Sequence, residues 1–145
     1  MRKHVLMMCT LLLMIPSAWA SSDNTPTIAM DIRPVNIASD ILYFPGPVPL
    51  QFALTVTNPT NEPVTLQGLN VQSVGPGAFS VRSGPVSVNR TIPAGGSATL
   101  TLSTWGRAHG GYMRAEEPVT LRAIGTFRSP SHHTFIRMIN QNLTP

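Results

Sequence analysis

The sequence predicts an all-β protein, an immunoglobulin-like antiparallel β-sandwich of about seven or eight strands, preceded by a cleaved signal peptide. Three observations predict this fold class. Apolar and polar residues alternate with a period of two in several segments. Stretches rich in proline and glycine separate these segments, as turns between short strands require. No segment shows the period of 3.6 residues that is typical of an amphipathic helix.

The first element is a secretory signal peptide at residues 1–20. Basic residues at positions 2–4 precede the short apolar run Val5–Ile15, and Ala18-Trp19-Ala20 forms an A-x-A cleavage site. The alternative is a retained membrane anchor, but the apolar run is shorter than the roughly 20 residues that a bilayer requires. We therefore expect three parts: the signal peptide at 1–20, a flexible N-terminus at 21–26 and a single β-sandwich domain at 27–145.

The composition of the exported part excludes several classes of function. Cys9 is the only cysteine and lies in the signal peptide, so the domain has neither a disulfide nor a cysteine nucleophile. Beyond residue 20 the chain has eight arginines and six acidic residues, a net charge of +2, and the arginines are scattered. Nucleic-acid binding requires a clustered basic face. We therefore expect no nucleic-acid partner, no cofactor and no membrane-spanning segment after cleavage.

The domain begins with three alternating segments. We expect a strand near 27–37, and a second near 50–57 in which Leu50, Phe52, Leu54 and Val56 share one face. A third is expected near 64–74, with a bulge at Gly68 that shifts the alternation. The apolar positions of these strands are the predicted core.

Five further segments complete the predicted sandwich. They lie near 79–82, 86–91, 97–104, 119–128 and 133–140. In the strand 97–104, Ala98, Leu100 and Leu102 point to one face, and serine and threonine to the other. Turns such as "IPAGG" separate neighbouring segments.

Two stretches do not alternate. Tyr43–Pro49, "YFPGPVP", cannot form a continuous ladder because proline lacks the amide hydrogen, and it is expected to shield a sheet edge. Trp105–Glu117, "WGRAHGGYMRAEE", is predicted to be a loop. Because loops often carry function, the loop 105–117 is the predicted site.

The order of these features resembles the late-embryogenesis-abundant group 2 domain, also called the water stress and hypersensitive response domain. The resemblance covers about residues 27–140 and depends on "FALTVTNPTNEPVTLQGLNVQSVG", "SVNRTIPAGGSATLTLS" and "PVTLRAIGTFRSP". The family has an Asn-Pro-Asn corner, which Asn58 and Pro59 match, whereas Thr60 replaces the second Asn. The resemblance implies an immunoglobulin-like fold and a protective or interaction role, with no catalytic residues. We expect Asn58 to shape the corner.

Three groups of residues suggest chemistry that we do not predict. "HGGY", His109–Tyr112, is similar to a lipase oxyanion loop, but the G-x-S-x-G motif is absent. His109, His132 and His133 suggest a metal site, yet adjacent strand residues point to opposite faces and no carboxylate has a suitable spacing. Glu116 and Glu117 are neighbours, whereas glycosidase carboxylates face each other across a cleft. We therefore predict neither an enzyme nor a metal protein.

The predicted partner-binding residues lie in the 105–117 loop. Trp105, Tyr112 and Met113 are of the types that interfaces favour, and Trp105 has the alternative of closing one end of the sandwich core. Charged and polar neighbours complete the predicted site: Arg107, His109 and Arg114.

We expect an exported, non-catalytic module, periplasmic rather than extracellular, that binds a protein or a cell-surface partner. Binding would use the 105–117 loop or strand pairing at a sheet edge. The alternative is a protective stress-response protein that acts on membranes or client proteins without a discrete site. The sequence identifies neither the partner nor the oligomeric state.

Overall fold

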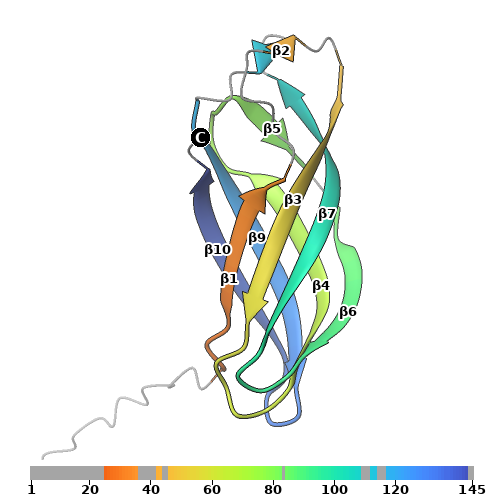
Figure 1. The fold of residues 1–145 in the computed structure, drawn as a ribbon, viewed down its shortest axis with the longest axis vertical. Helices are drawn as coiled ribbons and strands as arrows, with labels where there is room; N and C mark the ends of the chain where they lie inside the picture. The colour runs from red at the N-terminus through yellow and green to blue at the C-terminus, as the bar shows by residue number, and fades with distance from the viewer. Residues whose placement is uncertain are drawn as a thin grey trace, which may run out of the picture.

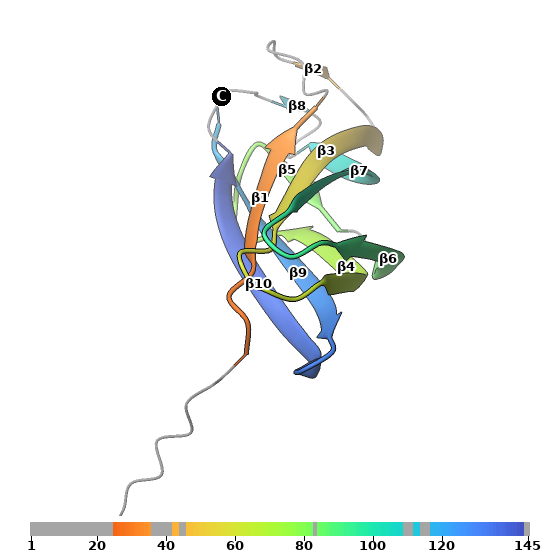
Figure 2. The ribbon, with the colours of Figure 1, turned by 60° about the horizontal axis from the view of Figure 1, so that its bottom comes forward.

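The computed structural model has an all-β fold in which two antiparallel sheets pack as a β-sandwich (Figures 1 and 2). It describes residues 25–35, 42–43, 46–82, 84–108, 112–113 and 117–143. The predicted signal peptide at 1–20 lies outside this part of the chain. None of the described residues belongs to a helix with the length and hydropathy needed to cross a membrane.

Each sheet has four strands. The first sheet has the order β1-β3-β7-β5, formed by β1 (Ala29–Pro34), β3 (Val48–Thr57), β7 (Ser97–Ala108) and β5 (Phe79–Val81). The second has the order β10-β9-β4-β6, formed by β10 (His133–Leu143), β9 (Val119–Ser129), β4 (Val64–Ser73) and β6 (Val86–Ile92). The short strands β2 (Leu42–Tyr43) and β8 (Tyr112–Met113) pair with each other. These two short strands account for the difference from the predicted strand number.

Two connections between the sheets lie at the same end of the sandwich, the lower end in Figure 1. One is the corner between β3 and β4, and the other is the predicted "IPAGG" turn between β6 and β7. Gly95 has a φ of 66°, a left-handed conformation that glycine adopts without strain. The N–H of Asn58 donates to the carbonyl of Gly96 at 2.9 Å, so the two connections are joined directly.

The core consists of the alternating apolar residues that the sequence predicts. Phe52, Leu54, Leu66 and Phe127 are completely buried between the sheets. The rings of Phe127 and Phe135 stack with centroids 5.7 Å apart. Each such side chain contributes on the order of 1.5–3 kcal/mol to stability, so this layer holds the sheets together.

The predicted bulge at Gly68 is confirmed. The pairing of β4 with both β6 and β9 shifts register between Leu66 and Gly68. Because of this shift, Leu66 and Leu69 both point into the core, although residues three apart on a regular strand point to opposite faces.

The predicted bounds of β1 and β3 are wrong. β1 ends at Pro34 and is shorter than the expected strand at 27–37. β3 begins at Val48, inside the stretch that was predicted to lack a ladder. Pro49 has no N–H to donate, but this group would not face β7. The carbonyl of Gln51 accepts from the N–H of Val35, so the odd-numbered residues of β3, including Pro49, face the side of β1. Because β1 ends before it reaches Pro49 and the even-numbered residues of β3 face β7, the ladder with β7 is preserved.

Candidate functional site

The predicted loop 105–117 is wrong at its beginning, because Trp105–Ala108 belong to β7. Trp105 pairs with Pro49 of β3, and Arg107 pairs with Ser80 of β5. Gly106, between Trp105 and Arg107, occupies the inward-facing position of the strand. A side chain there would overlap with Leu50, which fills the space that glycine leaves. The strand therefore continues although its inward face lacks an apolar side chain.

Trp105 is not a core residue. Its exposed fraction is 63%, which contradicts the alternative that it closes the end of the sandwich. On β7 the residues 97, 99, 101, 103 and 105 all point to the outer face of the first sheet. Trp105 is therefore a large aromatic side chain presented to solvent on a paired strand.

A hollow of about 200 Å³ adjoins the indole ring. It is lined by Pro47, Ser80, Arg82, Trp105, Gly106 and Arg107. The Oγ of Ser80 lies 3.5 Å from the carbonyl oxygen of Arg107, and this contact joins β5 to β7 within the lining of the hollow. We call this surface the Trp105 hollow.

The Trp105 hollow is basic. Arg107 is exposed, and in the part of the chain that the structure describes neither Arg82 nor Arg107 forms an ion pair. A guanidinium donates to carboxylates or phosphates in two parallel hydrogen bonds and also stacks on aromatic rings. The hollow thus combines an apolar ring with two cations that are available to an acidic or aromatic group of a partner.

The remaining predicted partner-binding residues follow β7. Tyr112 and Met113 form β8, where their backbones pair with Tyr43 and Leu42; their side chains are not among those described. His109 and Arg114 lie outside the described residues. The structure therefore brings together Trp105 and Arg107 from the predicted set and adds Arg82, which the sequence pattern did not indicate.

The opposite end of the sandwich holds a polar network centred on Asn58, which is completely buried. Its Nδ2 lies 2.8, 3.2 and 3.1 Å from the carbonyl oxygens of Glu62, Ile92 and Pro93. Its Oδ1 accepts from the N–H and the hydroxyl of Thr60 at 3.1 and 2.7 Å. Asn58 thus shapes the corner, as expected from the sequence.

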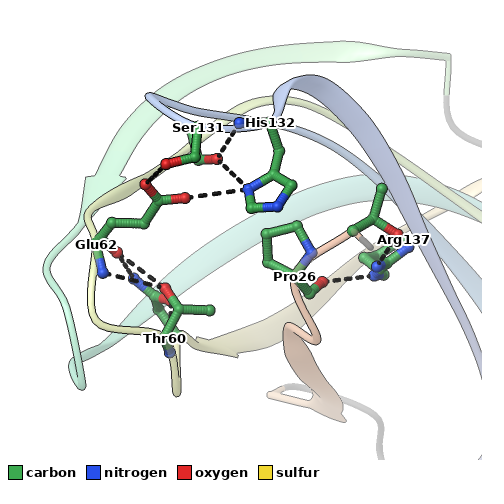
Figure 3. Close-up of polar contacts among 9 residues, drawn as sticks. Pro26, Thr60, Glu62, Ser131, His132 and Arg137 are labelled. Atoms are coloured by element: carbon green, nitrogen blue, oxygen red, sulfur yellow. Dashed lines mark hydrogen bonds and ion pairs between the residues drawn. The ribbon is translucent and has the colours of Figure 1, made fainter. Parts of the chain in front are cut away.

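Glu62 extends this network to the turn between β9 and β10 (Figure 3). The Oγ of Ser131 donates to Glu62 Oε2 at 2.6 Å, and His132 Nδ1 lies 3.3 Å from Oε1. Hydrogen bonding from Ser131 is the main cause that lowers the pKa of Glu62. The carboxylate joins the corner 58–63 to the turn 129–133.

This cluster does not have the geometry of a serine hydrolase. Ser129 Oγ and Glu62 both approach Nδ1 of His132, at 3.4 and 3.3 Å, whereas a triad places the nucleophile and the acid on different ring nitrogens. Among the described residues no three potential metal ligands come together. His132 faces Glu62, and His109 of the suggested metal site is not described.

A second, larger hollow of about 550 Å³ lies on the outer face of the second sheet. It is lined by Pro63, Thr65, Gln67, Thr91, Arg128, Ser129, Pro130 and His133. The hydroxyls of Thr65 and Thr91 bind each other at 3.0 Å. Its lining contains one guanidinium and no aromatic ring other than a histidine, so it offers fewer anchoring groups than the Trp105 hollow.

Comparison with known proteins supports the fold alone. No family model and no curated protein matches the chain. A structural-genomics target called SoR45 has a TM-score of 0.51 at 12% identity, covering 85% of this chain and 89% of that one. The solution structure of a putative late-embryogenesis-abundant protein has a TM-score of 0.51 at 13% identity, covering 84% of this chain and 73% of that one. The resemblance to that family is thus supported at the level of the fold.

Proposed function

We propose that this chain is an exported, non-catalytic, immunoglobulin-like module that binds a protein or cell-surface partner through the Trp105 hollow. The observation that carries the proposal is the 63% exposure of Trp105 beside two arginines that form no ion pair in the described part of the chain. The basic start, the apolar run and the A-x-A site of residues 1–20 support export, and a periplasmic rather than extracellular location is part of the proposal.

The mechanism is burial of the indole by the partner, with the two guanidinium groups at its rim. Trp and Arg are the residue types that most often dominate binding energy at interfaces. Trp105 is on β7, and the pairing with β3 holds its backbone in place, so binding has to order little additional backbone. An acidic or aromatic partner group fits the charge and the shape of this surface.

Truncation of the indole tests the proposal. Trp105→Ala should weaken partner binding by about 2 kcal/mol, which corresponds to about 30-fold. Ile136→Ala is the matched control, because Ile136 is 60% exposed on the outer face of the other sheet. The measurement is co-purification of envelope proteins with the tagged chain, followed by affinity determination for each captured protein. Equal capture by wild type and Trp105→Ala would refute the proposed site.

A second candidate function is protection of membranes or client proteins under water stress. The fold likeness to a putative late-embryogenesis-abundant protein favours it. A client enzyme that is dried and rehydrated with this chain should retain more activity than with an equal mass of albumin. Trp105→Ala should protect as well as wild type, since this function needs no discrete site, and equal protection by albumin would exclude the function.

A further inference from the structure

β7 has a long free edge. On one side it pairs with β3 from Ser97 to Gly106, but on the other side it pairs with β5 only from Gly106 to Ala108. The stretch Ser97–Trp105 therefore has no strand partner on the side away from β3 among the residues that the structure describes. Figure 2 shows this side of the sandwich, where β7 and β6 lie at the margins of the two sheets.

The backbone groups that point to this free edge belong to the odd-numbered residues of β7. Gln51 of β3 faces β1, so the even-numbered residues of β3 face β7. Because Leu54 pairs with Leu100, the even-numbered residues of β7 face β3. The N–H and C=O groups of the remaining positions face outward: Ser97, Thr99, Thr101, Ser103 and Trp105. None of these groups bonds to another described residue.

Sheet edges in native proteins are usually blocked, and the other long edges here are. The N–H of Ile32 on β1 donates to Gln141 Oε1 at 2.9 Å, so a side chain occupies that edge. β6 is bent at Asn89, which has a φ of 52°. β10 carries the charge of Arg137. In contrast, Ser97–Trp105 contains no charged residue, proline or glycine, and nothing in its sequence opposes pairing.

The inner side of this edge is apolar and incompletely covered. Leu100 and Leu102 are only half-buried although they point toward the core, and Val86 across the gap is 49% exposed. A cavity of about 20 Å³ between them is lined mainly by Phe52, Leu69, Val71, Val86 and Leu102. An added strand whose alternate residues are apolar would cover this surface.

We propose that two copies of this chain associate by antiparallel pairing of their β7 strands about a two-fold axis at Thr101. The β7 strand of a second copy has the alternating residues that can pair with this edge. Its inward residues Ala98, Leu100 and Leu102 are apolar, and its outward residues are uncharged, so no like charges meet. The unpaired stretch Ser97–Trp105 is the same in both copies, and it ends at Gly106, where the pairing of β7 with β5 starts.

The register follows from the positions of the free backbone groups. Thr101 lies opposite Thr101 of the second copy, Thr99 opposite Ser103, and Ser97 opposite Trp105. All five outward-facing residues then form hydrogen-bonded pairs, giving about ten inter-subunit hydrogen bonds. The two first sheets join into one continuous sheet, an isologous interface. This association goes beyond the proposed partner binding and does not depend on it.

Sedimentation velocity over a range of concentrations tests the association. The chain purified in its processed form should be a dimer at tens of micromolar. Thr101→Lys should make it monomeric, because two ammonium groups would face each other at the axis. Thr134→Lys is the matched control, since Thr134 is exposed on β10 and adds the same charge, and it should remain a dimer. A monomeric wild type, or a dimer that Thr101→Lys does not weaken, would overturn the proposal.

Cysteine cross-linking tests the register separately, in the processed form, which lacks Cys9 and has no other cysteine. Directly opposed residues of a hydrogen-bonded pair have Cα atoms about 5.5 Å apart, within the range that a disulfide spans. Thr101→Cys should therefore form a covalent dimer under mild oxidation. Thr99→Cys should not, because the two copies of residue 99 would be offset by about 13 Å along the strands. Equal cross-linking at both positions, or none at residue 101, contradicts the register.

Discussion

Asn58→Ala should destabilise the domain more than any other change of a polar residue in the corner. Asn58 is completely buried, and its amide group holds the backbone of Thr60, Glu62, Ile92 and Pro93. Its two amide hydrogens are shared among three carbonyl oxygens, and its oxygen accepts two further hydrogen bonds. The alanine variant leaves these backbone groups unsatisfied in the protein interior.

The magnitude follows from the number of these bonds. About four hydrogen bonds at a net of roughly 1 kcal/mol each give about 4 kcal/mol. Water can reach Thr60 and Glu62 in part, which reduces the expected loss in the free energy of unfolding to about 3 kcal/mol. This is a large fraction of the stability of a small domain, which is typically about 5–15 kcal/mol.

Urea unfolding followed by far-ultraviolet circular dichroism measures this loss. Asn140→Ala is the matched control, because Asn140 is exposed and accepts one hydrogen bond from Arg122 at 2.9 Å. It should change stability by no more than about 0.5 kcal/mol. If Asn58→Ala loses less than about 1 kcal/mol with an unchanged dependence on urea, the corner is not held by this side chain and the reasoning is refuted.

Three further predictions concern the core, the strand β7 and the turn network. Leu54→Asp places a carboxylate at a completely buried position and should leave the chain unfolded, so a native circular dichroism spectrum would contradict the assigned core. Gly106→Ala overlaps with Leu50 and should cost about 1–3 kcal/mol in urea unfolding, whereas Gly46→Ala has open space and should cost less. The pKa of Glu62 is lowered by Ser131, so its stabilising contribution is present above pH 4.5 and is lost as the pH falls through the lowered pKa. The stability difference between wild type and Glu62→Gln should therefore shrink as the pH falls below 4.5, and a constant difference would contradict this role.

Alternation predicted the inward faces of the central strands because each of them has one side against the core. In β3 and β9 the predicted apolar positions, such as Leu54 and Phe127, are completely buried. The bulge at Gly68 was also predictable, since the alternation changes phase there. The order of the strands within the sheets was not predictable, because a period of two indicates which face is buried but not which neighbour pairs.

The end of β7 was missed for a physical reason. The inward positions after Leu102 are Thr104 and Gly106, and neither has an apolar side chain, so the pattern stops. The strand nevertheless continues, because Leu50 of β3 occupies the space above Gly106 and β5 pairs with the backbone. A contribution from another strand replaces the missing side chain, and only the folded structure contains that information.

The orientation of Trp105 could still have been predicted, and it determines the candidate site. Counting by two from Leu100 and Leu102 places residues 104 and 106 inward and Trp105 outward, on the same face as Ser103. A tryptophan at an outward position of a strand cannot close the core of its own sandwich without a second layer above it. No described element covers the ring, which is 63% exposed, and this exposure is what makes it the centre of the candidate site.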